Sequence, residues 1–436
     1  MPTPRPIARA AALAAPTGFA DIELRSPLLL REEDRAATRS QILGVTASRG
    51  VERNVVFARR TDNAPGTGSF EDPFDGSSAA LIDAALRPLS LATASDVNVT
   101  FLPSATPYET FGSGNATVSD VGTRGFWACQ RWTFFLHGAT LKLVETAALN
   151  PWVLGTVMAD NDRQFRVYGG VIDCNQAALR VANPDLETAN GIGGRVGSGT
   201  RFCDVEIRGH YAENHDGGAA LEVGAVHADI RDVFVERVRI HSCAGQPIGI
   251  KLWCNHHHDA TAWLTATVRD CDITLPGLGD FNSGINYFGV RGTKITGTQF
   301  RGCYVGIFND TAPDNELVIS GNDFETCGKA VFSSGDFEPQ SRNVEVIDNR
   351  IVVPNGQQGI NVAGINSLWR IARNRISLVS GSGIGIVLAA GAEGHPYTII
   401  DDNIIDDALT NTLPAGYVLA ASRNRTETGA LAFADI

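Results

Sequence analysis

IARNRI, residues 371–376, places an asparagine three residues after one isoleucine and two residues before another. The same spacing recurs in three further stretches of the chain. These are ISGNDF at 319–324, VIDNRI at 346–351 and IDDNII at 400–405. The recurrence indicates that one structural unit is repeated along the chain.

Alignment on the asparagine extends the repeat to eight units at intervals of 24 to 33 residues. The aligned column is Val205, Val238, Cys271, Thr298, Asn322, Asn349, Asn374 and Asn403. Three residues earlier the chain is always apolar, at Phe202, Val235, Val268, Ile295, Ile319, Val346, Ile371 and Ile400. Two residues later it is again apolar, at Ile207, Ile240, Ile273, Phe300, Phe324, Ile351, Ile376 and Ile405. Fixed apolar columns separated by variable lengths are typical of a solenoid.

The flanks of the asparagine predict strands. VEVIDNRIVV at 344–353 alternates apolar and polar residues with a period of two and is rich in Val and Ile. A helical repeat would need longer paired segments with a period of 3.6, and none fits. A third apolar stretch follows each variable loop, in GGAALEV, PIGIKLW, SGINYFG, YVGIFND, KAVFSSG, QGINVAG, GIGIVLA and AGYVLAA. We therefore expect three strands in each coil.

The asparagine is expected to serve the structure rather than the chemistry. It lies where two strands meet at a sharp bend, and asparagine tolerates left-handed backbone angles better than most residues. Equivalent residues of successive coils lie about 4.8 Å apart, so stacked amides can hydrogen-bond to one another. Cys243, Cys303 and Cys327 share another column, which predicts stacked, buried thiols.

Composition excludes several classes of protein. With 43% hydrophobic and 19% charged residues the chain is globular, and its net charge of −12 disfavours nucleic acid and anionic membranes as partners. No apolar stretch is long enough to span a membrane as a helix. The eight cysteines include no CxxC pair, which disfavours zinc-ribbon and thioredoxin-like sites. The N-terminal MPTPRPIARAAALAAPTGFA is a weak match to a signal peptide, because Arg9 interrupts its apolar run.

Four regions are predicted. Residues 1–65 lack the repeat and form an N-terminal extension or arm, and residues 66–95 contain a capping helix that starts near Ser77. Residues 96–425 form the solenoid, and residues 426–436 form a C-terminal tail over its last coil. A cover at each end is expected because open parallel strands promote aggregation.

The chain resembles the pectin lyase-like superfamily over about residues 90–425. The resemblance rests on the repeat described above, on NVTFLPSATPYET at 98–110 and on GFWACQRWTFFLHGATLKLV at 125–144. The resemblance implies an all-β, right-handed single-stranded parallel β-helix with three strands per coil. It also favours an extracellular, periplasmic or cell-surface location.

In the resembling family, substrates lie along the outward face of the strand that follows the variable loop. Mapped onto this chain, the candidate catalytic residues are His215, Asp216, Glu222, Lys251 and Asp280, and the candidate substrate-binding residues are Trp253, Asn255, His256, His258, Asp259, Asn286 and Asp310. Other interpretations remain for several of them. His215 and Asp216 suit an acid–base pair or a turn, Glu222 and Lys251 a salt bridge or a sugar site, and the HHHD run a solvated loop, a substrate contact or a metal site.

These residues predict an enzyme that hydrolyses or eliminates an extended polysaccharide, with no cofactor and no metal. Carboxylates for hydrolysis are available in Asp216, Glu222, Asp280 and Asp310. However, the chain lacks the combined NxD, DD, GHG and RxK set of polygalacturonase-like relatives, because GIK at 249–251 keeps only the lysine of RxK, Lys251. It also lacks a clear acidic cluster with a matching arginine, as calcium-dependent lyases have. The alternative is a non-catalytic glycan-binding or structural protein, similar to an adhesin or a tailspike. The oligomeric state is left open.

Overall fold

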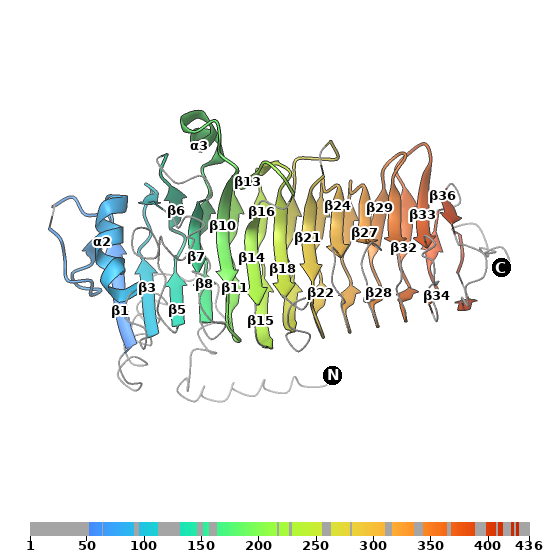
Figure 1. The fold of residues 1–436 in the computed structure, drawn as a ribbon, viewed down its shortest axis with the longest axis horizontal. Coiled ribbons are helices and arrows are strands. Elements are labelled where there is room, and N and C mark those ends of the chain that lie inside the picture. The colour runs from blue at the N-terminus through green and yellow to red at the C-terminus, as the bar shows by residue number, and fades with distance from the viewer. Residues whose placement is uncertain are drawn as a thin grey trace, which may run out of the picture. The chain divides into compact units, whose positions relative to one another are not determined.

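The computed structural model describes residues 52–62, 64–90, 96–111, 131–145, 151–156, 164–215, 218–225, 229–254, 263–279, 281–309, 316–334, 343–363, 368–388, 398–406, 409–412, 420–422 and 424–426. Apart from Glu52, these residues belong to one compact unit, Arg53–Ile436. Within them the strands form three long sheets, and each coil of the chain contributes one strand to each sheet in turn (Figure 1).

Among the described residues, the first sheet has 14 strands and the second has 11, and neighbouring strands in both pair in parallel. The first comprises β1 (Glu52–Ala58), β2 (Phe74–Asp75), β3 (Asp96–Phe101), β5 (Arg131–Phe135), β8 (Gln164–Tyr168), β11 (Arg201–Cys203), β15 (Ile230–Glu236), β19 (Leu264–Arg269), β22 (Lys294–Thr296), β25 (Val318–Ser320), β28 (Glu345–Ile347), β31 (Arg370–Ala372), β34 (Ile399–Asp401) and β37 (Ala420–Ser422). The second comprises β4 (Tyr108–Thr110), β6 (Thr140–Leu143), β9 (Val171–Asp173), β12 (Glu206–Arg208), β16 (Arg239–His241), β20 (Asp272–Thr274), β23 (Gln299–Arg301), β26 (Asp323–Glu325), β29 (Arg350–Val353), β32 (Arg375–Leu378) and β35 (Ile404–Ile405).

The third sheet has 12 described strands and carries the candidate site. It comprises β7 (Trp152–Thr156), β10 (Thr188–Arg195), β13 (Tyr211–Ala212), β14 (Ala219–Ala225), β17 (Ala244–Gly245), β18 (Ile248–Cys254), β21 (Ser283–Phe288), β24 (Val305–Asn309), β27 (Lys329–Ser333), β30 (Gln358–Val362), β33 (Gly383–Leu388) and β36 (Leu409–Thr412). The antiparallel pair β10–β13 is an addition to an otherwise parallel arrangement. The predicted three strands per coil are confirmed.

The apolar columns of the repeat form the core. All sixteen residues in the two columns beside the bend are at most 1% exposed. Each also faces its equivalent in the next coil, as Val346 faces Ile371 and Phe300 faces Phe324. Burial of one such side chain contributes about 1.5–3 kcal/mol, so the columns account for much of the driving force for coiling.

The asparagine column forms the predicted ladder. The backbone N–H and Nδ2 of Asn322 both donate to Asn349 Oδ1 at 3.0 Å, and Asn349 Nδ2 donates back to the carbonyl of Ile319 at 3.0 Å. The pattern continues through Asn374 and Asn403. It ends at Asn424, one coil beyond the predicted repeat, which accepts both donors of Asn403.

The left-handed residue of the bend is not the asparagine, and this part of the prediction was wrong. Positive φ angles occur one position earlier, for example 59° at Asp348, 56° at Arg373 and 52° at Asp402. The asparagine is needed inside, where its amide satisfies buried polar groups. The preceding side chain faces solvent, and Asp348 pairs with Arg373 of the next coil at 2.7 Å.

Glycines in the third sheet make room for large side chains of the second sheet. A Cβ on Gly306 would lie 2.7 Å from the Phe324 ring, and one on Gly284 would lie 2.6 Å from the Phe300 ring. The two phenylalanine rings stack at 4.8 Å with an interplanar angle of 5°. Absence of a side chain at these glycines therefore allows the widest residues of the column to be buried.

The N-terminal end carries the expected helix. It is α2 (Ala79–Ser90), which buries Ile82 and Leu86 but leaves Leu81 41% exposed. The parallel sheet starts earlier than residue 96, because β1 pairs with β2. These strands lack the bend motif, so the repeat does not reveal them. A second helix, α3 (Gln176–Ala182), lies within a connection between β9 and β10.

The last coil differs from the prediction. The third sheet ends with β36, and Ala420 and Ala421, the last two residues of AGYVLAA, belong to β37 of the first sheet. The reason is the short final interval between Asn403 and Asn424, which places the third strand before this stretch.

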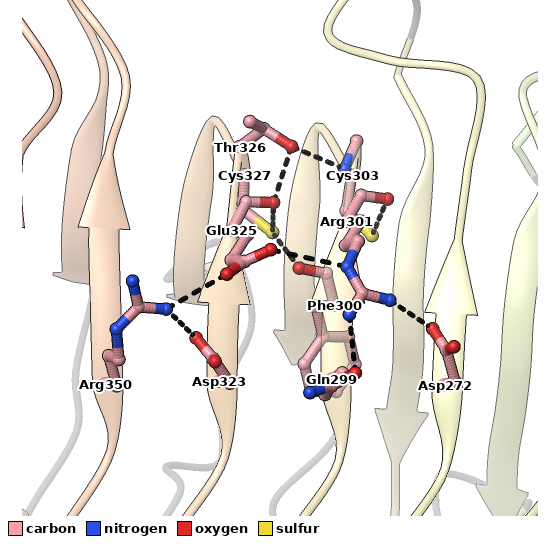
Figure 2. A network of polar contacts seen from close by, with 11 residues as sticks. Asp272, Gln299, Phe300, Arg301, Cys303, Asp323, Glu325, Thr326, Cys327 and Arg350 are labelled. Carbon is pink, nitrogen blue, oxygen red and sulfur yellow. Dashed lines mark hydrogen bonds and ion pairs between the residues drawn. The ribbon is translucent and has the colours of Figure 1, made fainter.

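Ion pairs link the coils on the outward face of the second sheet, as Figure 2 shows. Arg301 lies 2.7 Å from Asp272 and 3.3 Å from Glu325, while Arg350 lies 2.7 Å from Asp323 and 3.1 Å from Glu325. Such part-exposed pairs contribute up to about 1 kcal/mol each. Among the described residues, no helix is long and apolar enough to cross a membrane.

Candidate functional site

The candidate site lies on the outward face of the third sheet, where successive coils align their side chains in a row. Glu222 of β14 pairs in register with Lys251 of β18, and Lys251 pairs with Asn286 of β21. The row continues with Phe308 and Phe332. Three polar residues are therefore followed, one coil at a time, by two aromatic residues.

The carboxylate of Glu222 is held by an indole. Trp253 Nε1 donates to Glu222 Oε1 at 2.8 Å, so this oxygen has a fixed donor while the side chain stays half-buried. The indole reaches back across Gly224, where a Cβ would lie 2.5 Å from the ring. On the other side it stacks with Phe288 at 6.2 Å and 22°. Gly224 and Phe288 thus fix the indole, which in turn orients the carboxylate.

Two lysines on this face have no ion-pair partner among the described residues. Lys251 lies beside Glu222 in register, but its Nζ is placed 6.0 Å from the centre of the Phe288 ring and no salt bridge joins the two residues. The predicted salt bridge is therefore not formed. Lys329 Nζ lies 3.7 Å over the Phe332 ring, and burial lowers the pKa of its ammonium group. Both cations rest on aromatic rings.

His215 lies just before β14 of the third sheet and contacts residues of several coils. Its backbone N–H donates to Gln246 Oε1 at 3.2 Å, and its Nε2 lies 3.1 Å from the hydroxyl of the buried Ser283. The imidazole meets the rings of Phe281 and Phe308 edge-on, at 4.4 and 5.8 Å. His215 is therefore positioned by contacts to the two following coils and beyond.

Aromatic rings lie on both sides of the polar part of the row. Phe308 and Phe332 stack at 5.4 Å with an angle of 7°, and Phe281 contacts both Phe308 and Tyr304. Because stacked rings cover each other's faces, a ligand meets mainly their edges. Glu222, Lys251 and Asn286 thus lie between the Trp253–Phe288 pair at the strand ends and the phenylalanine group along the sheet.

No protein-family model matches the chain, and no curated protein matches its sequence. Among solved structures, the chain is similar to the family 28 exopolygalacturonase of Yersinia enterocolitica, with 10% identity and a TM-score of 0.50. The match covers 82% of this chain and 76% of that one. The protein has the fold of a right-handed parallel β-helix.

Two further solved structures are similar to the chain at lower TM-scores. Pre-mature gene product 12 of bacteriophage phi29 has 11% identity and a TM-score of 0.49, over 80% of this chain and 50% of that chain. The A-module of a mannuronan C-5 epimerase of Azotobacter vinelandii has 13% identity and a TM-score of 0.43, over 80% and 94%. At such identities the likeness concerns the fold alone.

The β-helix brings five of the predicted site residues onto one face in neighbouring coils. These are His215, Glu222, Lys251, Trp253 and Asn286. The other seven lie outside the described residues: Asp216, Asn255, His256, His258, Asp259, Asp280 and Asp310. Among the described residues, no group of three His, Cys, Asp or Glu side chains could hold a metal ion.

Sequence reasoning missed several neighbours of the site on this face of the β-helix. These are Phe281, Ser283, Tyr304, Phe308, Lys329 and Phe332. One signal was present, because Phe308 and Phe332 are each the fourth residue of their strand, in VGIFN at 305–309 and KAVFS at 329–333. The contact between His215 and Ser283 had no such signal, since it joins a loop to a strand 68 residues later.

Proposed function

We propose that this protein binds an extended polysaccharide along the outward face of the third sheet and cleaves it by hydrolysis or elimination. The observation that carries the proposal is the row Glu222, Lys251 and Asn286, in which a carboxylate, an ammonium group and an amide follow one another in adjacent coils. Carbohydrate sites combine such polar groups with aromatic surface, which Trp253 and Phe288 supply here. The exopolygalacturonase shares the fold, which supports this class of substrate by analogy only.

Two reactions fit these side chains. In hydrolysis, Glu222 acts with a second carboxyl group from Asp216, Asp280 or Asp310, because glycosidases use a pair of carboxyl groups. In elimination, the Lys251 amine takes the proton from the carbon beside an electron-withdrawing carboxylate of the sugar, a carbon–carbon double bond forms, and the bond to the leaving glycosidic oxygen breaks. In both, Trp253 keeps Glu222 oriented, and His215 organises the aromatic side of the site.

The charges favour a glycan that carries acidic groups. The chain as a whole has a net charge of −12. Glu222 is nevertheless the only carboxylate within strands β14, β18, β21, β24, β27, β30 and β33, whereas Lys251 and Lys329 lie there without an ion-pair partner among the described residues. An acidic polysaccharide supplies the missing counter-charges.

The second candidate function is non-catalytic glycan binding, as in an adhesin-like or tailspike-like protein. The same lone carboxylate favours it, because the described strands of this face offer no second acid for hydrolysis. The two candidates share the site and differ only in whether the glycan is cleaved.

The test is a screen of the purified protein against neutral and acidic polysaccharides, scored for binding, new reducing ends and ultraviolet absorbance of unsaturated products. We expect Glu222→Gln and Lys251→Met to lower binding or turnover at least about 10-fold, as loss of one charged contact predicts. Glu109→Gln and Lys294→Met are matched controls, because both side chains are exposed on the other sheets. Binding without any product would favour the non-catalytic function, and absence of both on every glycan would refute the site.

A further inference from the structure

Two buried thiols lie opposite each other in successive coils. Arg301 pairs in register with Glu325, and the Gly328 N–H donates to the Cys303 carbonyl at 2.9 Å. The pairing therefore continues across Cys303 and Cys327. In-register residues of neighbouring parallel strands are about 4.8 Å apart, which lies within the Cα separation of about 4.4–6.8 Å that a disulfide spans.

Both cysteines are buried, and they lie close to Arg301 and Glu325 of the ion-pair network (Figure 2). Cys303 is 0% exposed and Cys327 is 2% exposed. Cys327 Sγ leans toward the preceding coil, since it lies 3.7 Å from the carbonyl of Phe300. Burial, and then the adjacent Cys327 thiol, raises the pKa of the Cys303 thiol well above its ordinary value.

No other two described cysteines are placed in this way. Cys203 faces Glu236 in register, and Cys254 faces Ala225. Cys243 lies between His210 and Pro276 in the column, so neither neighbouring coil places a cysteine opposite it in register. The geometry thus singles out one pair.

We propose that Cys303 and Cys327 are a cross-linking site, at which a small disulfide such as oxidised glutathione joins two successive coils covalently. In the first step the Cys327 thiolate attacks the glutathione disulfide, which breaks that S–S bond and releases one glutathione thiolate. The Cys303 thiolate then attacks Cys327 Sγ of the mixed disulfide and releases the second. Two protein thiols are oxidised, one glutathione disulfide is reduced, and the two protons end on the released thiols.

Burial determines when the reaction takes place. A buried thiol with a raised pKa is a poor nucleophile and is closed to glutathione in the folded coil. Cross-linking therefore occurs while the coils assemble, before both sulfurs are covered. The closed loop is one coil long, and its restriction of the unfolded chain raises the melting temperature by roughly 4 °C in a unit of this size.

The experiment refolds the full chain with oxidised glutathione or with a reductant and then alkylates remaining thiols under denaturing conditions. Both cysteines fall in one tryptic peptide, residues 302–329, which is expected unalkylated and about 2 Da lighter after oxidation, because two hydrogens are lost. Cleavage at the acidic residues between them then yields two fragments held together by the disulfide.

Cys303→Ser and Cys327→Ser are expected to abolish this linkage and the gain in melting temperature, whereas Cys271→Ser, a buried cysteine outside the pair, preserves both. Peptide mapping of the unsubstituted chain keeps the test decisive if a variant fails to fold. Full alkylation of both residues after oxidative refolding, or linkage of either to a different cysteine, overturns the proposal.

Discussion

The coils over residues 164–290 and those over residues 294–426 build the same bend in two different ways. In the first group the buried residue at the bend is Val205, Val238 or Cys271. In the second it is Thr298 followed by asparagines up to Asn424, whose side chains bond from coil to coil. The intervals also differ, since the longest, of 33 residues, fall in the first group.

The difference separates scaffold from site. A ladder asparagine is useful only if the next coil supplies another amide at the same height, so the ladder holds consecutive coils in fixed register. An apolar residue at the bend does not require a matching residue in the next coil. The coils with apolar bends carry the longer loops and the polar row from Glu222 to Asn286. Regular coils thus give rigidity, and irregular coils carry the candidate chemistry.

The largest effect on stability is expected from removal of one asparagine of the ladder. Asn349→Ala removes the acceptor of two Asn322 donors and the donor to the carbonyl of Ile319, while Asn374 Oδ1 keeps only the backbone N–H of residue 349. We expect the free energy of unfolding to fall by about 3–5 kcal/mol, because each unsatisfied buried group costs about 1–3 kcal/mol. Chemical denaturation measures it. Val238→Ala is the apolar counterpart and should cost only about 2 kcal/mol, from lost burial and a small cavity. Equal losses would contradict the special role of the ladder.

Low pH should change the stability of the two groups of coils differently. His210 is fully buried in the first group, donates from Nδ1 to the carbonyl of Ala189 at 2.8 Å, and has its pKa lowered by burial to about 4. Its neutral form stabilises the fold fully above the unfolded pKa of about 6.5, and this contribution is lost as the pH falls toward 4.

The loss reaches about 3 kcal/mol over that range, and the amide ladder does not titrate there. Denaturation curves between pH 7 and 4 should show it, and His210→Gln should remove this part of the dependence. An unchanged pH dependence in the variant would speak against His210 as its source.

A smaller effect is expected where the two sheets meet closely. A Cβ on Gly306 would lie 2.6 Å from the carbonyl of Ala330 and 2.7 Å from the Phe324 ring. Because the carbonyl belongs to the backbone of the next coil, Gly306→Ala should destabilise the fold by about 1–3 kcal/mol in thermal or chemical denaturation. Gly279→Ala is the matched control, since nothing lies within 4 Å of its added Cβ. Similar stabilities for both variants would refute the close packing.

The sequence predicts most of the scaffold, because the residues that build it repeat. The columns through Val346 and Ile351 are visible as periodic apolar positions, and burial is what repetition in a solenoid requires. The bend was assigned only in part. Tolerance of left-handed angles suggested Asn349, but the need for hydrogen bonds in the core decides its place, and Asp348 takes the strained angle.

The candidate site was less predictable. Register places Glu222 beside Lys251, which the alignment of coils anticipates. The hydrogen bond from Trp253 to Glu222 and the contact of His215 with Ser283 depend on side-chain directions and on loops of unequal length, which no repeat encodes.

Backbone hydrogen exchange of the full chain, with and without a bound acidic polysaccharide, tests most directly whether the ligand lies on the coils with apolar bends. We expect added protection in β14, β18 and β21, with little change in β30, β33 and β36. Protection confined to the asparagine-ladder coils, or to strands of the first and second sheets, would contradict it.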